Sequence, residues 1–241
     1  MKKHLMFLLI CFTVVLAIVS IGQAQEKITG PWLWMIAPTE SGRGGSASTD
    51  VDTLAKASGG TVTAADIAEN GVKVGSECGN YVWTPGEISA SGGNNVNDIV
   101  TEIGLGKGDI DDHDSWAYIE LNATAKKGVT ARVGSDDCIV VWLNGEIVHR
   151  NAVDRGAGDF QDTFKVDLVD GINRLLVKVG EAGGGWSMFV GIDADYNIMD
   201  FETFGGNVVR PQNDKTVTQN QKLEVKINMS IFDLLHDFTS N

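Results

Sequence analysis

The sequence predicts an all-β sandwich, and three observations lead to that prediction. At least six short segments rich in β-branched and aromatic residues follow one another between residues 72 and 195, with glycine-rich connections. Asn144 and Gly145 stand between two of these segments. An Asn-Gly pair is a strong signal of a two-residue hairpin turn, because both turn residues must adopt a positive φ. Across residues 163–168 apolar and polar side chains alternate, as in a strand with one face in a core.

Two short helices are expected before most of the strands. Asp50 or Thr49 can cap a helix over residues 51–58. Thr63 and Asp66 have the spacing of a capping box, which would begin a second helix. An aromatic-rich segment precedes both helices and is expected to be a first strand or a docked arm.

The predicted organisation has four parts. The last part is polar and linker-like, and it ends in apolar residues with helical spacing, so we expect a poorly ordered tail with a terminal helix. The parts are a signal peptide over residues 1–24, an N-terminal extension with short helices over 25–71, the β-sandwich over 72–195 and the tail over 196–241.

The N-terminus predicts export. Lys2 and Lys3 precede a continuous apolar run over residues 5–21, and small residues stand at Gly22 and Ala24, the two positions that a signal peptidase reads. We therefore expect cleavage after Ala24 and a protein that is secreted, periplasmic or held at the cell surface. The alternative is that the run is kept as a membrane anchor, since its length is close to a minimal span. The membrane would then be contacted through this segment alone.

The charge balance excludes two classes of partner. The chain has 19 basic and 32 acidic residues, and removal of residues 1–24 takes away two lysines and no acid, which leaves a net charge of −15. A charge of this sign and size repels nucleic acid and anionic lipid, so neither is an expected partner. The same charge is compatible with divalent cations.

Two cysteines remain after the signal peptide, Cys78 and Cys138. In an oxidising compartment an even count allows a disulfide, and closing this loop would stabilise the fold by about 4 kcal/mol on the chain-entropy model. The other interpretation makes Cys138 a small apolar residue at the start of a buried strand. We favour the second, since a domain of this size does not need a covalent staple.

Part of the sequence resembles a known family of secreted modules. The residues that carry the resemblance are 134–137, 142–145, 162–168, 170–173 and 175–179. Around them the chain resembles the galactose-binding-like jelly roll that accompanies many secreted bacterial glycoside hydrolases. The resemblance implies a jelly-roll β-sandwich. It does not name one function, because such modules include sugar binders, calcium-stabilised spacers and inert structural domains.

The sequence contains none of the short motifs that mark common catalytic sites. It has no HExxH helix, Gly-x-Ser-x-Gly elbow, phosphate-binding loop or CxxC pair. Glycoside hydrolysis needs two carboxylates at a defined separation, and nothing in the spacing of the many acidic residues selects such a pair. We therefore expect a protein that is not an enzyme, with a glycoside hydrolase as the alternative.

The densest group of acidic residues lies just before a predicted strand. Asp109, Asp111 and Asp114 offer carboxylate oxygens, the hard ligands that Ca²⁺ prefers, although the EF-hand pattern is absent. We expect these three residues to contribute to a structural Ca²⁺ site. The alternative is a solvated acidic loop whose aspartates cap turns. Residues 136–137 and 193–195 form two further acidic corners.

Tryptophans are the candidates for contact with a glycan. The chain has six, and the apolar face of a sugar can stack on an exposed indole. Trp186 follows three glycines and Trp83 precedes a Thr-Pro-Gly turn, so these two rings are predicted to face the ligand. Trp142 stands in an apolar run and is expected in the core. Asp112 and Asn94 are the predicted polar contacts on the loops.

Two functions from different classes remain. The first is a secreted, non-catalytic carbohydrate-binding module that contacts a glycan through loop aromatics and polar residues. The second is an extracellular structural or protein-interaction domain, with residues 193–241 as a tether. If the protein binds a glycan, the ligand should sit on loops at one end of the sandwich or on a concave sheet face, since the strand interiors fill the core.

Overall fold

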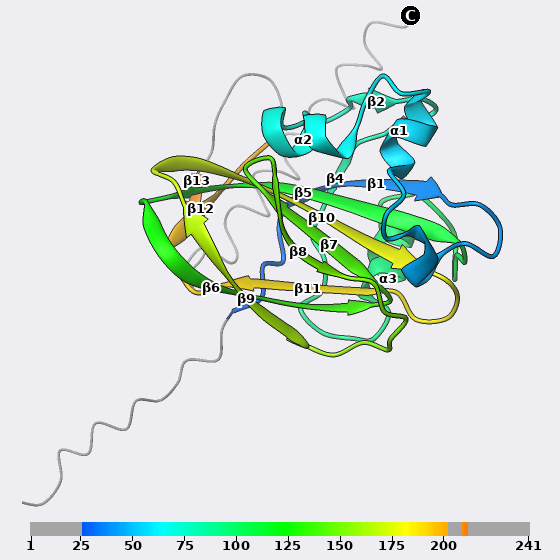
Figure 1. Cartoon of the computed structure of the whole chain (residues 1–241). Helices are drawn as coiled ribbons and strands as arrows, with labels where there is room; N and C mark the ends of the chain where they lie inside the picture. Colours follow the sequence, from blue (N-terminus) through cyan, green and yellow to red (C-terminus); the bar gives the residue numbers. More distant parts are fainter. Residues whose placement is uncertain (1–25, 202–208, 212–241) are drawn as a thin grey trace, which may run out of the picture.

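The computed structural model describes residues 26–201 and 209–211, and it is built mainly of antiparallel strands (Figure 1). The predicted signal peptide and the predicted terminal helix lie outside the described residues. Within the described part, no helix is both long and apolar enough to span a membrane.

The elements alternate between a few short helices and many strands. The helical elements are the 3-10 turn η1 (Gly45–Ser48), α1 (Thr53–Ser58), α2 (Ala64–Asn70) and α3 (Asn95–Glu102). The strands are β1 (Trp32–Pro38), β2 (Glu77–Cys78), β3 (Tyr81–Val82), β4 (Thr84–Gly86), β5 (His113–Ala123), β6 (Lys126–Asp136), β7 (Ile139–Leu143), β8 (Glu146–Asn151), β9 (Asp162–Leu168), β10 (Gly171–Glu181), β11 (Ser187–Ile192), β12 (Tyr196–Met199) and β13 (Val209–Pro211).

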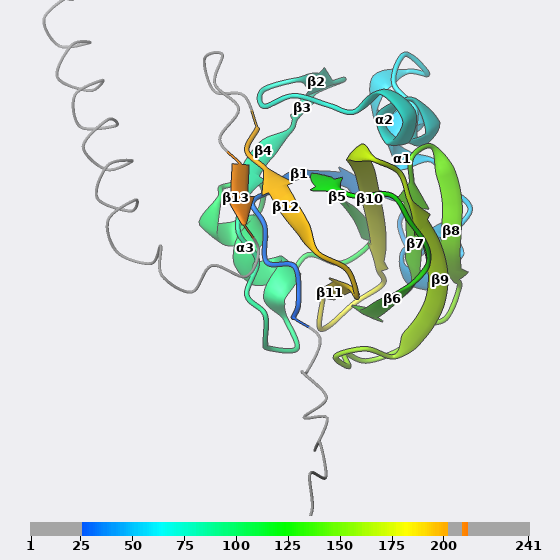
Figure 2. The same cartoon turned by 90° about the vertical axis from the view of Figure 1, so that its left-hand side faces the viewer.

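Two sheets enclose the main core. The larger has the order β13-β12-β5-β10-β7-β8, with β1 beside β5 and β4 beside β1, and the smaller has the order β11-β6-β9. Figure 2 shows β11 and β6 as a layer beneath β5 and β10. Inward side chains of both sheets, such as Val177 of β10 and Val133 of β6, belong to one buried cluster. The all-β class is therefore confirmed, and the jelly-roll connectivity stays a prediction.

A second core lies on the outer face of the larger sheet. Along β10 the side chain of Leu176 points to this face while its neighbours point inward, as the two-residue period of a strand requires. Helices α1 and α2 cover the face, and Figure 1 shows them above the sheet. Leu54 of α1 and Ile67 of α2 pack there with Trp116.

Side-chain caps begin both of these helices. The side chain of Asp52 accepts a hydrogen bond from the backbone N–H of Ala55 at the start of α1. Thr63 and Asp66 form a capping box at the start of α2, which is the pair that the sequence singled out. Neither of the predicted caps of α1, Asp50 or Thr49, is the residue that caps it.

The larger sheet extends beyond both ends of the predicted sandwich. Strand β1 lies in the predicted N-terminal extension, yet it pairs with β5 from Leu33 opposite Tyr118 to Pro38 opposite His113. Strand β12, which begins at Tyr196, pairs with the other end of β5. The boundaries predicted after residues 71 and 195 are thus not boundaries of the sheet.

The cysteines and one tryptophan behave as buried apolar residues. Cys78 and Cys138 are both buried free cysteines, which agrees with the prediction of Cys138 as a small apolar residue. Trp142 is 8% exposed and packs against Trp116, so its predicted place in the core is confirmed.

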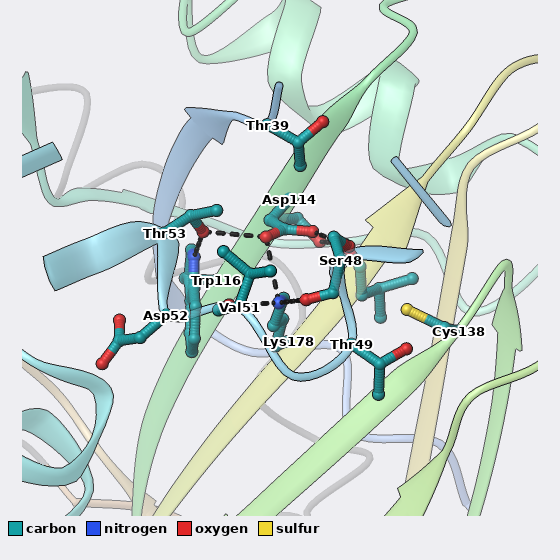
Figure 3. Close-up of polar contacts among 12 residues, drawn as sticks. Thr39, Ser48, Thr49, Val51, Asp52, Thr53, Asp114, Trp116, Cys138 and Lys178 are labelled. Carbon is teal, nitrogen blue, oxygen red and sulfur yellow. Dashed lines mark hydrogen bonds and ion pairs between the residues drawn. The ribbon is translucent and has the colours of Figure 1, made fainter. Parts of the chain in front are cut away.

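A buried ion pair ties the N-terminal segment to the larger sheet (Figure 3). Lys178 of β10 and Asp114 of β5 are 1% and 0% exposed, and Nζ lies 3.0 Å from Oδ2. The Lys178 ammonium also donates to the carbonyl oxygens of Ser48 and Val51, at 2.5 and 2.7 Å. The Asp114 carboxylate accepts hydrogen bonds from the hydroxyls of Ser48 and Thr53, at 2.6 and 2.8 Å.

Removal of one partner of this pair should be costly. Asp114→Ala leaves a buried ammonium without its carboxylate, so we expect the free energy of unfolding in urea to fall by about 3–5 kcal/mol. Asp114→Ala combined with Lys178→Met should recover part of that loss, because no unpaired charge remains. Asp170→Ala, at an exposed turn, is the matched control. A loss below about 1 kcal/mol for Asp114→Ala would show that the pair behaves like a surface ion pair.

The turn between β7 and β8 should tolerate glycine far better than a β-branched residue. Asn144 and Gly145 have φ angles of 52° and 89°, so the predicted hairpin turn is confirmed. A Cβ on Gly145 would find its nearest neighbour at 3.5 Å, so the backbone angle and not a clash opposes substitution. Gly145→Val should lower stability by about 1–2 kcal/mol. Gly156→Val, in open space without a positive φ, should melt within a degree or two of the parent, and equal melting of both variants would contradict this account.

Candidate metal centre

Three acidic side chains converge where strands of the two sheets end. Asp136 is the last residue of β6, Asp137 follows it, and Glu181 is the last residue of β10. Each offers a carboxylate oxygen, and these oxygens all lie within 4.8 Å of one another. The set is called the acidic cluster below.

Glu181 is the most unusual member of the acidic cluster. It continues the inward positions of Val177 and Val179 along β10, so the strand places its carboxyl group at the end of the sandwich interior. The residue is 0% exposed, and neither carboxylate oxygen has a hydrogen-bond partner among the described residues. A charge buried in this way is costly unless a counter-charge compensates it. Burial, followed by the charges of Asp137 and Asp136, raises the pKa of Glu181 to about 9.

The two aspartates are held by backbone N–H groups of neighbouring loops. Asp137 accepts from Arg155 at Oδ1 and from Ala182 at Oδ2, at 3.1 and 3.0 Å. Asp136 accepts from Ala157 at Oδ2, at 3.1 Å. Burial and the adjacent Asp137 charge raise the pKa of Asp136 to about 6, and burial also raises the pKa of Asp137. The backbone donors therefore fix the orientation of both carboxylates. Burial and neighbouring acidic groups still raise their pKa values.

Two glycines allow loops to approach the acidic cluster closely. A Cβ on Gly185 would lie 2.8 Å from Oδ2 of Asp136 and 2.7 Å from the carbonyl oxygen of Gly93. A Cβ on Gly45 would lie 3.0 Å from Oδ2 of Asp137, and this glycine also has a φ of +54°. A side chain at either position would displace the loop from the carboxylates.

The residues of the acidic cluster fit a hard divalent cation. All the donors are carboxylate oxygens, the ligand type of Ca²⁺ and Mg²⁺, whereas zinc and copper sites in proteins generally include histidine or cysteine. A bound cation would displace the proton that Glu181 otherwise keeps at neutral pH and would compensate the resulting carboxylate charge. The fit rests on that orphaned carboxylate and on the chemistry of the donor set.

The predicted calcium ligands divide into two groups. Asp114 is wrong as a ligand, because Lys178 and two hydroxyls occupy its carboxylate on the other face of the sheet. Asp109 and Asp111 lie close enough to Glu181 for their charges to raise its pKa further. Asp109 accepts a hydrogen bond from the Asn97 amide at 2.7 Å. These two aspartates therefore flank the acidic cluster, and Asp114 does not belong to it.

The sequence offered a partial signal for this centre. The sequence marks residues 136–137 as an acidic corner, but Glu181 lies just beyond the predicted strand that ends at residue 179, and no local pattern marks it. The register of β10 on β5 places Glu181 opposite His113, directly beside the acidic loop that precedes β5. Such a pairing joins residues far apart in sequence, and no local pattern reveals it.

The predicted glycan-stacking rings require a correction. Trp83 is 1% exposed and Trp186 is 0% exposed, so neither indole offers a face to a ligand. Trp186 begins the inward series that continues with Met188 and Val190 of β11. The glycines before it build the loop, and the ring itself fills the core.

The predicted polar contacts lie on loops beside the acidic cluster. The Asn94 side-chain oxygen accepts from the backbone N–H of Trp186 at 3.2 Å, which ties the start of α3 to the loop before β11. Asp112 accepts from the backbone N–H groups of Gly42 and Gly44, at 2.7 and 3.0 Å. These hydrogen bonds lower the pKa of Asp112. Both side chains organise the loops around the centre.

Comparisons with known proteins do not assign the chain to a family. No family model and no curated protein matches it. Among solved structures, the PA14 domain of the MpAFP antifreeze protein is similar with a TM-score of 0.37 and 10% identity over 77% of this chain and 89% of that one. The PA14 sugar-binding domain from an RTX adhesin has a TM-score of 0.34 and 14% identity over 74% and 94% of the two chains. Similarities this weak establish no shared ligand.

The buried Glu181 should make the metal-free protein less stable at higher pH. Between the ordinary pKa of 4.5 and the folded value of about 9, the folded state keeps a proton that the unfolded state releases, so stability falls as pH rises through this window. We expect the melting temperature in EDTA to decrease from about pH 5.5 to about pH 8.5. Glu181→Gln should flatten the decrease, and a profile identical to that of the parent would rule out Glu181 as its source.

Proposed function

We propose that this protein is a secreted, non-catalytic module that holds Ca²⁺ at the acidic cluster and binds a glycan at the same end of the sandwich. The observation that supports it most directly is the Glu181 carboxylate, which is fully buried without a hydrogen-bond partner beside Asp136 and Asp137. An ionised carboxylate buried in this way lowers the stability of the fold unless something compensates its charge.

The cation would be held by the residues of the acidic cluster. Asp136 and Asp137 are positioned by backbone N–H groups, and Glu181 is positioned by the end of β10. The charges of Asp109 and Asp111 add to the negative potential at the centre. The proposed calcium site thus differs from the one that the sequence predicted. The acidic cluster provides the ligands, Asp109 and Asp111 lie beside it, and Asp114 is left out.

The glycan part of the proposal depends on the chemistry of a bound cation. Ca²⁺ accepts six to eight oxygen ligands in flexible geometry, so it can coordinate sugar hydroxyls in addition to protein carboxylates. With Trp83 and Trp186 buried, recognition would depend on the cation and on polar loop groups instead of an aromatic platform. The loops meet at one end of the sandwich, where ligands of rigid β-scaffolds commonly bind. The resemblance of residues 72–195 to galactose-binding-like modules is consistent with this class of ligand.

A structural role is the second candidate, and one observation favours it. The aspartates of the acidic cluster already connect two loops, through Arg155 and Ala157 on one and Ala182 on the other. A cation there would brace these loops without any glycan. The module would then present a surface to another extracellular protein.

Calcium and glycan titrations separate these functions. We expect Ca²⁺ to raise the melting temperature of protein dialysed against EDTA, by an amount that grows with ligand excess. At a Ca²⁺ concentration 100 times Kd, the free energy of unfolding should increase by about 2.7 kcal/mol. Asp137→Asn and Glu181→Gln should weaken the site, so the rise should need higher Ca²⁺ concentrations, and Asp170→Asn, at an exposed turn, should respond as the parent does. Binding on a glycan array should require Ca²⁺.

Each outcome points to a different conclusion. A melting temperature that responds to neither EDTA nor Ca²⁺ would exclude the cation site and the proposed function with it. A calcium response without binding to any glycan on the array would favour the structural role.

A further inference from the structure

We propose that Arg155 is a positioning residue for the acidic cluster, and that its guanidinium fixes Asp137 for cation binding from a distance. The inference rests on the proposed cation site. The Arg155 side chain donates to Ser135 and Asp162, which lie outside the acidic cluster. Its role is therefore not visible from the ligand set.

The Arg155 guanidinium is locked in place by two partners. It donates to both carboxylate oxygens of Asp162, at 3.1 and 2.8 Å, which is a bidentate pair. It also donates to the hydroxyl oxygen of Ser135 from Nη2 and Nε, at 2.8 and 3.3 Å. The side chains of Arg155 and Asp162 are 15% and 16% exposed, so solvent competes little with these bonds.

Two hydrogen bonds connect Arg155 and Ser135 to Asp137. The backbone N–H of Arg155 donates to Oδ1 of Asp137 at 3.1 Å. The Ser135 hydroxyl, which accepts from the guanidinium, donates to the carbonyl oxygen of Asp137 at 2.7 Å. An arginine side chain can only donate, so the Ser135 proton is left free to point at Asp137. Asp137 is thereby held at both its side chain and its backbone.

Asp162 is itself well anchored on β9. Besides Arg155, it accepts from the Asn151 amide at 3.1 and 3.2 Å, and Nε2 of His149 lies 3.1 Å from its Oδ2. The connection therefore runs from the edge strands β8 and β9 through Arg155 to the end of β6. It offers a rigid frame for one carboxylate of the acidic cluster.

A ligand that is already oriented loses less freedom when the cation binds. Partners that orient metal ligands from outside typically change metal affinity by 10–100-fold when they are removed. Lysine cannot replace arginine here, because a single ammonium cannot pair with both Asp162 oxygens and Ser135 in one plane. The conservative change Arg155→Lys therefore keeps the charge and removes the frame.

The test is the affinity for Ca²⁺, measured by calorimetry on the whole chain. Arg155→Lys should weaken binding by about 10–100-fold. Arg150→Lys is the matched control, since Arg150 lies on neighbouring β8 and pairs with Asp50, outside the frame. Asp162→Asn, which breaks the frame from its other side, should weaken binding similarly and add little to Arg155→Lys.

Two backgrounds distinguish positioning from a general loss of structure. If Arg155 acts through Asp137, Arg155→Lys should have no further effect in Asp137→Asn and should keep its full effect in Asp136→Asn. An equal effect in both backgrounds, or wild-type affinity in Arg155→Lys, would overturn the inference while leaving the cation site intact. A parent protein that binds no Ca²⁺ would overturn the inference and the proposed function together.

Discussion

The buried pair of Lys178 and Asp114 is the interaction on which the arrangement of this molecule depends. It joins the two central strands β5 and β10 and, through the carbonyl oxygens of Ser48 and Val51, fastens the segment before α1 to them. The start of β5 and the end of β10 lie next to each other just beyond this pair, and both lead directly to the loops around the acidic cluster. A change in the pair would therefore disturb the outer core and the acidic cluster together, although neither contains the pair.

The same two strands carry acidic residues with opposite environments. Asp114 on β5 has an ammonium and two hydroxyls around its carboxylate, so it has both a counter-charge and hydrogen-bond donors within the protein. Glu181 on β10 is equally buried, and in the described part of the chain its oxygens have no donor. The first arrangement stabilises a fold without further ligands. The second has no donor among the residues described to stabilise an ionised carboxylate, so without a cation the raised pKa keeps Glu181 protonated at neutral pH.

Local chemistry explains what the sequence could predict. The positive φ angles of Asn144 and Gly145, the capping box of Thr63 and the alternation around Phe164 depend on residues that are close in sequence. They identified a turn, a helix and a strand within an all-β fold. Features of the centre depend on pairing between distant segments. Glu181 meets the acidic loop only through the register of β10 on β5, and the Lys178 partner of Asp114 comes from the same register.

The placement of β5 also determines when the domain can assemble. This strand pairs with β1, β10 and β12, so its neighbours come from both ends of the described chain. A nascent polypeptide that has not yet released residues 171–181 has no central strand pair and exposes an unpaired edge of β5. Such non-local pairing slows folding, because the entropy of loop closure is lost before the distant segments form stabilising contacts. The topology favours a chain in which this sheet forms only after β10 has been synthesised.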